Sequence, residues 1–165
     1  MNNSEHVIAV SIQVRKWIAL GLMMVLPTLA VGREGEEGHE IPGTTTVALD
    51  ELKGQALHEE LVRTAMAFDV FNQRCRGVSA STQASQVNRL FVEKYRMTVN
   101  NFLRELMQVD GRELEQKIER SVNQTVMGLG GCQKARADGM EQRFKENFRT
   151  LIEKARQSPW YPVRP

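Results

Sequence analysis

The stretch TQASQVNRLFVEKYRMTVNNFLRELMQ, residues 82–108, carries the clearest helical pattern in the chain. Its apolar residues recur at steps of three and four, which is the spacing of one face of an α-helix. They are Val87, Leu90, Phe91, Tyr95, Val99, Phe102, Leu103 and Leu106. Ser81 or Thr82 can cap the start of this helix. The stretch therefore predicts a long amphipathic helix whose apolar face packs against other helices.

Three further stretches repeat this spacing, at residues 50–74, 112–127 and 132–157. Their apolar stripes are Leu57, Leu61, Ala65, Phe68 and Phe71; then Leu114, Ile118, Val122 and Val126; then Met140, Phe144, Phe148, Leu151, Ile152 and Ala155. The aromatic members sit at core positions of these stripes, so we interpret them as core rather than as the lining of a ligand cavity.

The ends of these helices have recognisable signals. Asp110, followed three residues later by Glu113, is a capping box. Glycines around Gly130 end the preceding helix, and Ser158-Pro159 ends the last one. No alternating pattern typical of a β-strand is present. Four helices joined by short links predict an all-α fold, an antiparallel up-down-up-down four-helix bundle over residues 50–158.

The two cysteines fit this topology. Cys75 lies at the end of the first predicted helix and Cys132 at the junction of the third and fourth. In an up-down-up-down bundle both positions fall at the same end, so we expect one disulfide, which would stabilise the fold by about 4 kcal/mol. The alternative is a pair of reduced, buried cysteines. Their spacing excludes a CxxC redox pair and a zinc knuckle.

The N-terminus has the three parts of a secretory signal. Arg15-Lys16 is followed by the apolar run of residues 17–30 and by Val31-Gly32. We interpret residues 1–32 as a signal peptide, cut after Ala30 or Gly32, and expect a periplasmic or secreted protein. The alternative is an inner-membrane anchor formed by residues 17–31, although a spanning helix needs about 20 apolar residues. Export into an oxidising compartment favours the disulfide.

Residues 33–49 are rich in Gly, Glu and Thr, which predicts a flexible acidic tether. Acidic residues outnumber basic ones from Arg33 to Glu60, and the reverse holds from Leu61 to Pro165. Basic side chains in the second part alternate with Glu instead of clustering, which is typical of a solvated helix surface. We therefore expect no nucleic-acid partner.

The C-terminal residues 159–165 read PWYPVRP, an extended tail with three prolines and two large aromatic side chains. Two interpretations stay open. Trp160 can fold back and seal one end of the bundle, or Trp160 and Tyr161 can dock into a groove on a partner protein. Both residues are therefore candidate partner-binding residues.

Few residues in the chain have the types and spacing that catalysis or metal binding needs. His39 and His58, with nearby Glu side chains, are the only candidate metal ligands, and no pair has the helical spacing of a metal motif. We interpret His58 as part of a solvated helix face. No nucleophile motif or phosphate-binding loop is present. We expect no metal, no cofactor and no catalytic residues, hence no enzyme.

The layout is similar, in architecture alone, to small periplasmic helical proteins such as secretin pilotins, acid-stress chaperones and immunity proteins. These combine an exported helical body with a cysteine bridge near the end of the first helix. We expect a protein-binding accessory, adaptor, chaperone or inhibitor module that is not inserted in the membrane after signal cleavage. The alternative is a carrier of a small apolar ligand in a cavity between helices. The sequence leaves the partner and the oligomeric state open.

Overall fold

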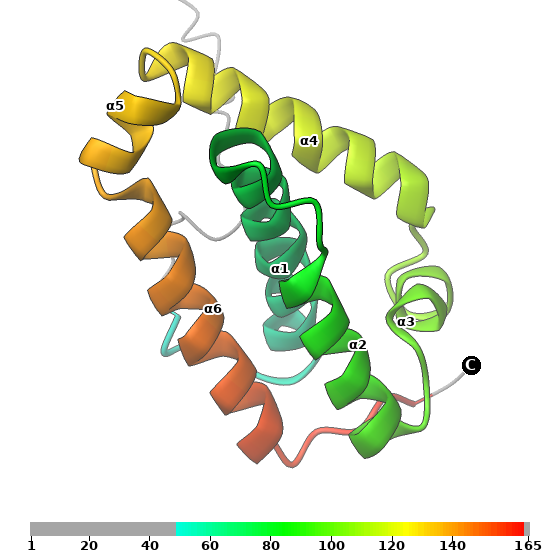
Figure 1. Ribbon diagram of the computed structural model, residues 1–165. Coiled ribbons are helices and arrows are strands. Elements are labelled where there is room, and N and C mark those ends of the chain that lie inside the picture. The colour runs from blue at the N-terminus through cyan, green and yellow to red at the C-terminus, as the bar shows by residue number, and fades with distance from the viewer. Residues whose placement is uncertain (1–48, 164–165) are drawn as a thin grey trace, which may run out of the picture. The chain divides into compact units, whose positions relative to one another are not determined.

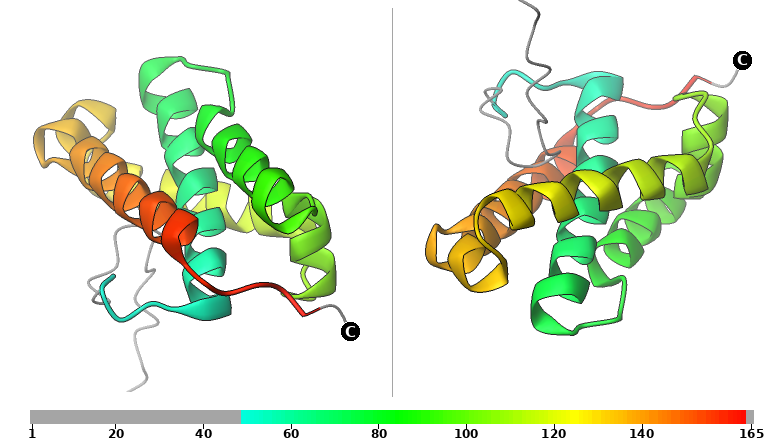
Figure 2. Two further views of the ribbon diagram at one scale, coloured as in Figure 1. Left: turned by 90° about the horizontal axis from the view of Figure 1, so that it is seen from below. Right: turned by 90° about the horizontal axis from the view of Figure 1, so that it is seen from above.

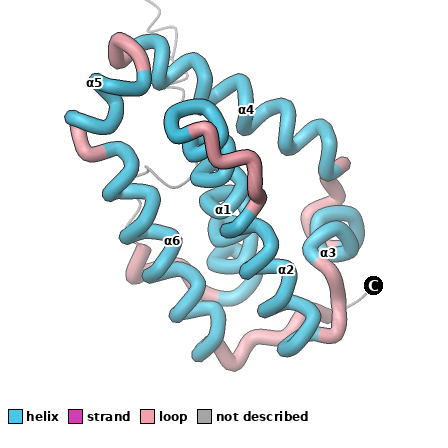
Figure 3. Tube along the Cα trace, viewed as in Figure 1, coloured by secondary structure: helices cyan, strands magenta, loops and turns pink. Residues whose placement is uncertain are grey.

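The computed structural model describes residues 49–163. Over that range its regular secondary structure consists of helices joined by loops, with no strand (Figures 1 and 3). The helices are α1 (Gly54–Arg76), α2 (Thr82–Tyr95), α3 (Val99–Glu105), α4 (Gly111–Gly128), α5 (Cys132–Ala137) and α6 (Met140–Gln157). The all-α class is confirmed. The predicted signal peptide, the alternative membrane anchor at residues 17–31 and the tether up to residue 48 lie outside the described residues.

Helix α1 is the central element of the fold, with α2, α4 and α6 packed around it (Figures 1 and 2). A helix enclosed in this way must bury nearly its whole circumference, so polar positions are buried along with apolar ones. Four polar side chains of α1 are accordingly buried: His58, Thr64, Asp69 and Asn72.

The helix predicted over residues 82–108 is two helices, which corrects the sequence prediction. Arg96 takes a left-handed conformation (φ 55°) at the end of α2. Thr98 then caps α3 by accepting a hydrogen bond from the backbone N–H of Asn101. The turn brings Met97 into the core, where 2% of its surface is exposed. A continuous helix would not place Met97 on the same face as Tyr95.

The helix predicted over residues 132–157 is also divided, into α5 and α6. Gly139 (φ 78°) provides the left-handed residue at the break. The described residues therefore form six helices, and the predicted number of four is wrong. Figure 2 shows α4 running across α1, and the up-down-up-down arrangement of four antiparallel helices is not confirmed.

The predicted core is confirmed at nearly every position. All stripe residues predicted in α1, α4 and α6 are buried, as are those of α2 and α3 except Val99 and Leu106, which are half-buried against the core. Rings of α1 meet rings of α6, with the centroids of Phe68 and Phe144 5.7 Å apart. The hydrophobic contacts therefore follow the apolar periodicity even where the helices break.

The N-terminal cap of α4 agrees with the sequence prediction, whereas that of α2 differs from it. Asp110 caps α4 as predicted, accepting hydrogen bonds from the N–H groups of Arg112 and Glu113. At α2, neither Ser81 nor Thr82 provides a side-chain cap. Instead, the carboxylate of Asp69 reaches over from α1.

The Oδ1 of Asp69 accepts from the N–H of Gln83 (3.1 Å) and its Oδ2 from the N–H of Ala84 (2.8 Å). Burial raises the pKa of Asp69, and these backbone hydrogen bonds oppose the shift. The N-terminus of α2 is thus held directly against α1.

Candidate functional site

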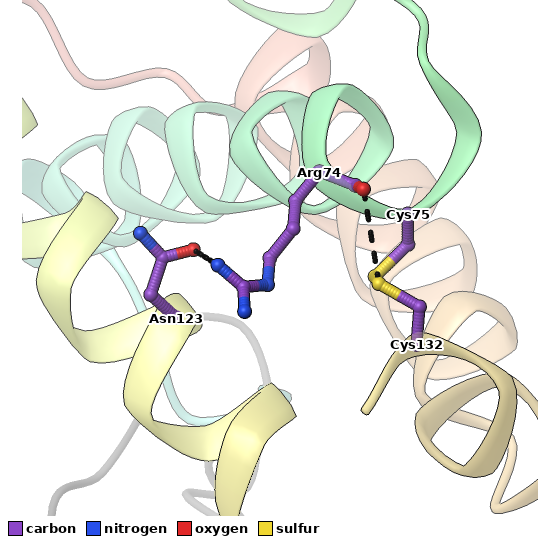
Figure 4. The surroundings of a disulfide bond; sticks show 4 residues. All are labelled: Arg74, Cys75, Asn123 and Cys132. Atoms are coloured by element: carbon purple, nitrogen blue, oxygen red, sulfur yellow. Dashed lines mark hydrogen bonds between the residues drawn. A yellow bond between two sulfur atoms is a disulfide. The ribbon is translucent and has the colours of Figure 1, made fainter. Parts of the chain in front are cut away.

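The Cys75–Cys132 disulfide predicted from the sequence is present in the structure (Figure 4). Cys75 lies in the last turn of α1, Cys132 is the first residue of α5, and their Cα atoms are 5.2 Å apart. Next to it, the guanidinium of Arg74 donates a hydrogen bond to the Oδ1 of Asn123 in α4 (2.6 Å). The C-terminal end of α1 is therefore joined covalently to α5 and by a hydrogen bond to α4.

His58 lies at the opposite end of α1, and its environment differs from the predicted solvated face. None of its surface is exposed. Its Nδ1 is 2.7 Å from the carbonyl oxygen of Gly54 and its Nε2 is 2.6 Å from the hydroxyl of Tyr95. Since a carbonyl oxygen can only accept, Nδ1 carries the hydrogen and Nε2 accepts from Tyr95. The sequence prediction was wrong because α2 and the residues that follow α6 cover this position of α1.

Aromatic rings surround the imidazole of His58. The ring centroids of Trp160, Tyr95 and Phe91 lie 4.5, 5.3 and 5.9 Å from it. Burial lowers the pKa of His58, the hydrogen bond to Gly54 opposes this shift, and the positive charge of Lys94 adds to it. The surroundings therefore favour the neutral imidazole.

Residues 158–163, which we call the C-terminal strap, run from the end of α6 across the ends of α1 and α2 (Figures 1 and 2). Lys94 of α2 holds the beginning of this strap. Its ammonium group donates to the carbonyl oxygens of Ala155 (2.7 Å), Arg156 (2.9 Å) and Ser158 (2.5 Å). Two carbonyls in the last turn of α6, and that of its C-cap residue Ser158, are thereby satisfied by one side chain.

The structure separates the two candidate partner-binding residues of the tail. Trp160 is half-buried and packs against the core, next to His58 and Phe102. Tyr161 is 60% exposed, although its ring lies 5.5 Å from that of Tyr95. Partner binding by these residues stays a prediction, and in this conformation only the Tyr161 ring is open to a partner.

Gly54 lies next to Trp160 in a left-handed conformation. Its φ of 55° is one that residues with a side chain rarely adopt, whereas a Cβ at this position would make an ordinary contact, 3.5 Å, with the indole of Trp160. The carbonyl of the same residue accepts the hydrogen bond from His58. One backbone unit therefore supports both the imidazole and the ring stacked on it.

An open groove runs along α1 on another face of the domain. A cleft of about 1090 Å³ and a smaller one of about 200 Å³ adjoin each other, because Met66, Ala84 and Glu115 line both. Helices α2 and α4 each pack closely on α1 but, in the described part of the chain, not closely on one another. We call this the α2–α4 groove; it is defined by Met66, Ala84, Ser85, Leu103, Arg112 and Glu115.

Other kinds of site receive no positive support from the described residues. Within them, no three His, Cys, Asp or Glu side chains gather closely enough to hold a metal ion. His39, the other histidine considered as a candidate metal ligand, lies outside the described residues. No helix between residues 49 and 163 combines the length and apolar character needed to cross a membrane.

Comparison of the chain with protein-family models, with curated proteins and with solved structures gives no match.

Sequence reasoning missed the residues that hold the strap. The sequence pattern predicts Tyr95 as a core residue and gives no particular role to Lys94, yet Lys94 binds the end of α6 and Tyr95 orients His58. A lysine near the C-terminus of a helix often binds the last carbonyl groups of that helix. Here Lys94 lies near the end of α2 but binds carbonyl groups of α6, which is distant in sequence, so this rule alone could not identify its partner.

Proposed function

We propose that this chain is a small exported helical protein that binds another protein, and that the α2–α4 groove is its binding surface. The observation that carries the proposal is the pair of adjoining open clefts between α2 and α4, which Met66 of α1 also lines. The groove lies where one more helix would complete the packing around α1. An amphipathic helix of a partner protein is therefore the occupant that fits it.

The chemistry of the groove supports this occupant. Its lining combines the apolar side chains of Met66 and Leu103 with the polar and charged side chains of Ser85, Arg112 and Glu115. Such a mixed lining suits a helix with one apolar face and charged flanks, since the rim of an interface is usually polar.

Export is the second part of the proposal. A cysteine pair placed for a disulfide suits the periplasm or the outside of the cell, because thiols stay reduced in the cytosol. The predicted signal peptide, residues 1–32, accounts for delivery. Should residues 17–31 instead remain as an anchor, the helical domain would face the same oxidising compartment.

The geometry gives less support to the alternative of a small apolar-ligand carrier. Carrier sites enclose most of a ligand in a mainly apolar cavity. The larger cleft here is open and has Arg104, Arg112 and Glu115 in its lining. Binding of a protein segment fits an open, mixed surface better. We further propose that the protein is not an enzyme and has no nucleic-acid partner.

Photo-crosslinking from opposite sides of the groove tests this function. A photoreactive residue is placed at Ser85 on α2 or at Arg112 on α4, with Lys145 on α6 as a control position that is exposed and outside the groove. In the periplasm of the native host, we expect both groove positions to give an adduct with the same protein and Lys145 to give none.

Filling the groove with Ala84→Trp should remove both adducts while the circular dichroism spectrum of the domain is kept. Equal labelling from Lys145, or adducts that survive Ala84→Trp, would show that the groove is not the binding surface.

A further inference from the structure

We propose that the C-terminal strap is an acid-sensitive latch, in which protonation of the buried imidazole of His58 releases Trp160 from the end of α1. The helices stay folded when the latch opens, and the strap then presents Trp160 beside Tyr161 as an accessible aromatic segment. This inference rests on the contacts of the strap and does not depend on the α2–α4 groove.

The hydrogen bonds of His58 are better formed with a neutral ring than with a protonated one. Nδ1–H donates to the carbonyl of Gly54, and Nε2 accepts from the hydroxyl of Tyr95. A second proton, on Nε2, would point at the Tyr95 oxygen and force the hydroxyl hydrogen to turn away. The Tyr95 hydroxyl would then have to donate to the carbonyl oxygen of Ala155. The two oxygen atoms are 3.4 Å apart, which is long for an O–H···O hydrogen bond.

The charges around the imidazole also oppose a second proton. Lys94 of α2 contributes a positive charge, and its ammonium group is fixed by the carbonyls at the end of α6. The groups that surround the His58–Tyr95 pair are Lys94 and Phe91 from α2, the Ala155 carbonyl from α6, and Trp160 and Tyr161 from the strap.

Release of Trp160 makes protonation of His58 less unfavourable, because the indole covers the imidazole, with 4.5 Å between the ring centroids. Once it leaves, water can reach a protonated His58. Burial lowers the pKa of His58 from its usual 6.5, and Trp160 is one of the residues that cover the imidazole, so the open form binds the proton more readily. Closure is therefore favoured above pH 6.5 and loses this advantage as the pH falls below it.

The position of the hinge follows from Lys94. Its hydrogen bonds reach the carbonyl of Ser158, so the end of α6 stays attached to α2 when Trp160 moves. The strap therefore pivots at Pro159, beyond the last held carbonyl. Since Trp160 is the strap residue that packs on the core, its release leaves the helix–helix contacts in place.

Tryptophan fluorescence of the full chain tests the latch. Trp17→Phe leaves Trp160 as the single tryptophan, and its emission is followed from about pH 7 to about pH 4 alongside the circular dichroism signal at 222 nm, the ordinary measure of helix. We expect the emission to move to the red, to that of a solvated indole, while the helical signal is unchanged. The midpoint should coincide with the imidazole titration of His58 seen by NMR.

Two variants make the assignment specific. His58→Gln keeps a neutral side chain of similar length and should abolish the emission change. His39→Gln is the matched control and should leave it intact. The latch is disproved if emission stays constant over this range, if it changes only together with loss of helix, or if its midpoint differs from that of His58. The NMR comparison uses the native histidine, so it decides the question even if His58→Gln fails to fold.

Discussion

The indole of Trp160 packs against the imidazole of His58, tilted by 33° and with 4.5 Å between ring centroids, and this contact closes one end of α1. The other end of the same helix is closed by the Cys75–Cys132 disulfide. The central helix is therefore fixed at its N-terminal end by an aromatic cluster and at its C-terminal end by a covalent bond. The α2–α4 groove lies along the length between them.

Loss of the Tyr95 hydroxyl should destabilise the domain. Tyr95→Phe leaves the Nε2 of buried His58 without a donor, which should cost about 1–3 kcal/mol in the free energy of unfolding. Tyr161→Phe removes a hydroxyl from a side chain that is 60% exposed and is the control, with little expected change. Urea denaturation at neutral pH measures both. Equal values for the two variants would mean that the His58–Tyr95 hydrogen bond contributes nothing.

Removal of the disulfide should lower stability without unfolding the helices. The free energy of unfolding of the double variant Cys75→Ser/Cys132→Ser should be about 4 kcal/mol lower. The disulfide of the native chain closes a long loop, which restricts the conformations of the unfolded state, and the variant lacks this restriction. Chemical denaturation followed by circular dichroism provides the value. The single variant Cys75→Ser should behave alike under reducing conditions. Unchanged stability in the double variant would contradict this prediction.

Asp69 should contribute more to the free energy of unfolding than a surface carboxylate does, because it caps α2 from another helix. Asp69→Ala leaves the N–H groups of Gln83 and Ala84 without acceptors, at a cost of about 1–2 kcal/mol. Glu93→Ala, which breaks an exposed pair with Arg89 on the same helix, is the matched control and should have no measurable effect. Thermal melting of the two variants compares them, and a smaller loss for Asp69→Ala than for Glu93→Ala would refute the cap.

Alkaline pH should weaken the domain through Tyr95. Burial, the larger cause, and the neighbouring Tyr161 raise the pKa of Tyr95 from 10.0 to about 12. A phenol that holds its proton more tightly when folded contributes full stability below pH 10, and this contribution is lost as the pH rises from 10 to about 12. Melting temperatures across this interval should fall more steeply in the native chain than in Tyr95→Phe. Parallel slopes would argue against the shift.

The sequence was sufficient to predict what depends on periodicity. The stripes through Leu61, Phe91, Ile118 and Phe144 are core residues because a step of three or four residues keeps side chains on one helix face. Asp110 was predictable as a cap, since its partners are the next residues in the chain. The cysteine pair was also predictable, because it lies at the ends of predicted helices.

What the sequence did not predict depends on contacts between distant residues. His58 reads as a polar position beside Glu59, and only the enclosure of α1 by three helices makes it buried. The helix break at Arg96 is not marked by a glycine in the sequence. Arg96 takes a left-handed conformation that is unfavourable for a residue with a side chain, and the burial of Met97 next to it offsets that cost. Gly139 did carry a signal, since Asp-Gly is a common turn sequence.

The central claim is that the chain works outside the reducing cytosol as a disulfide-bonded binding protein. Intact-mass measurement of the protein from a periplasmic extract, alkylated at its thiols under denaturing conditions without reductant, tests it most directly. The account predicts a chain that begins at Val31 or Arg33, lighter by two hydrogen atoms than the reduced form and with no alkylated cysteine. A full-length chain in the cytoplasm, with both Cys75 and Cys132 alkylated, would contradict it.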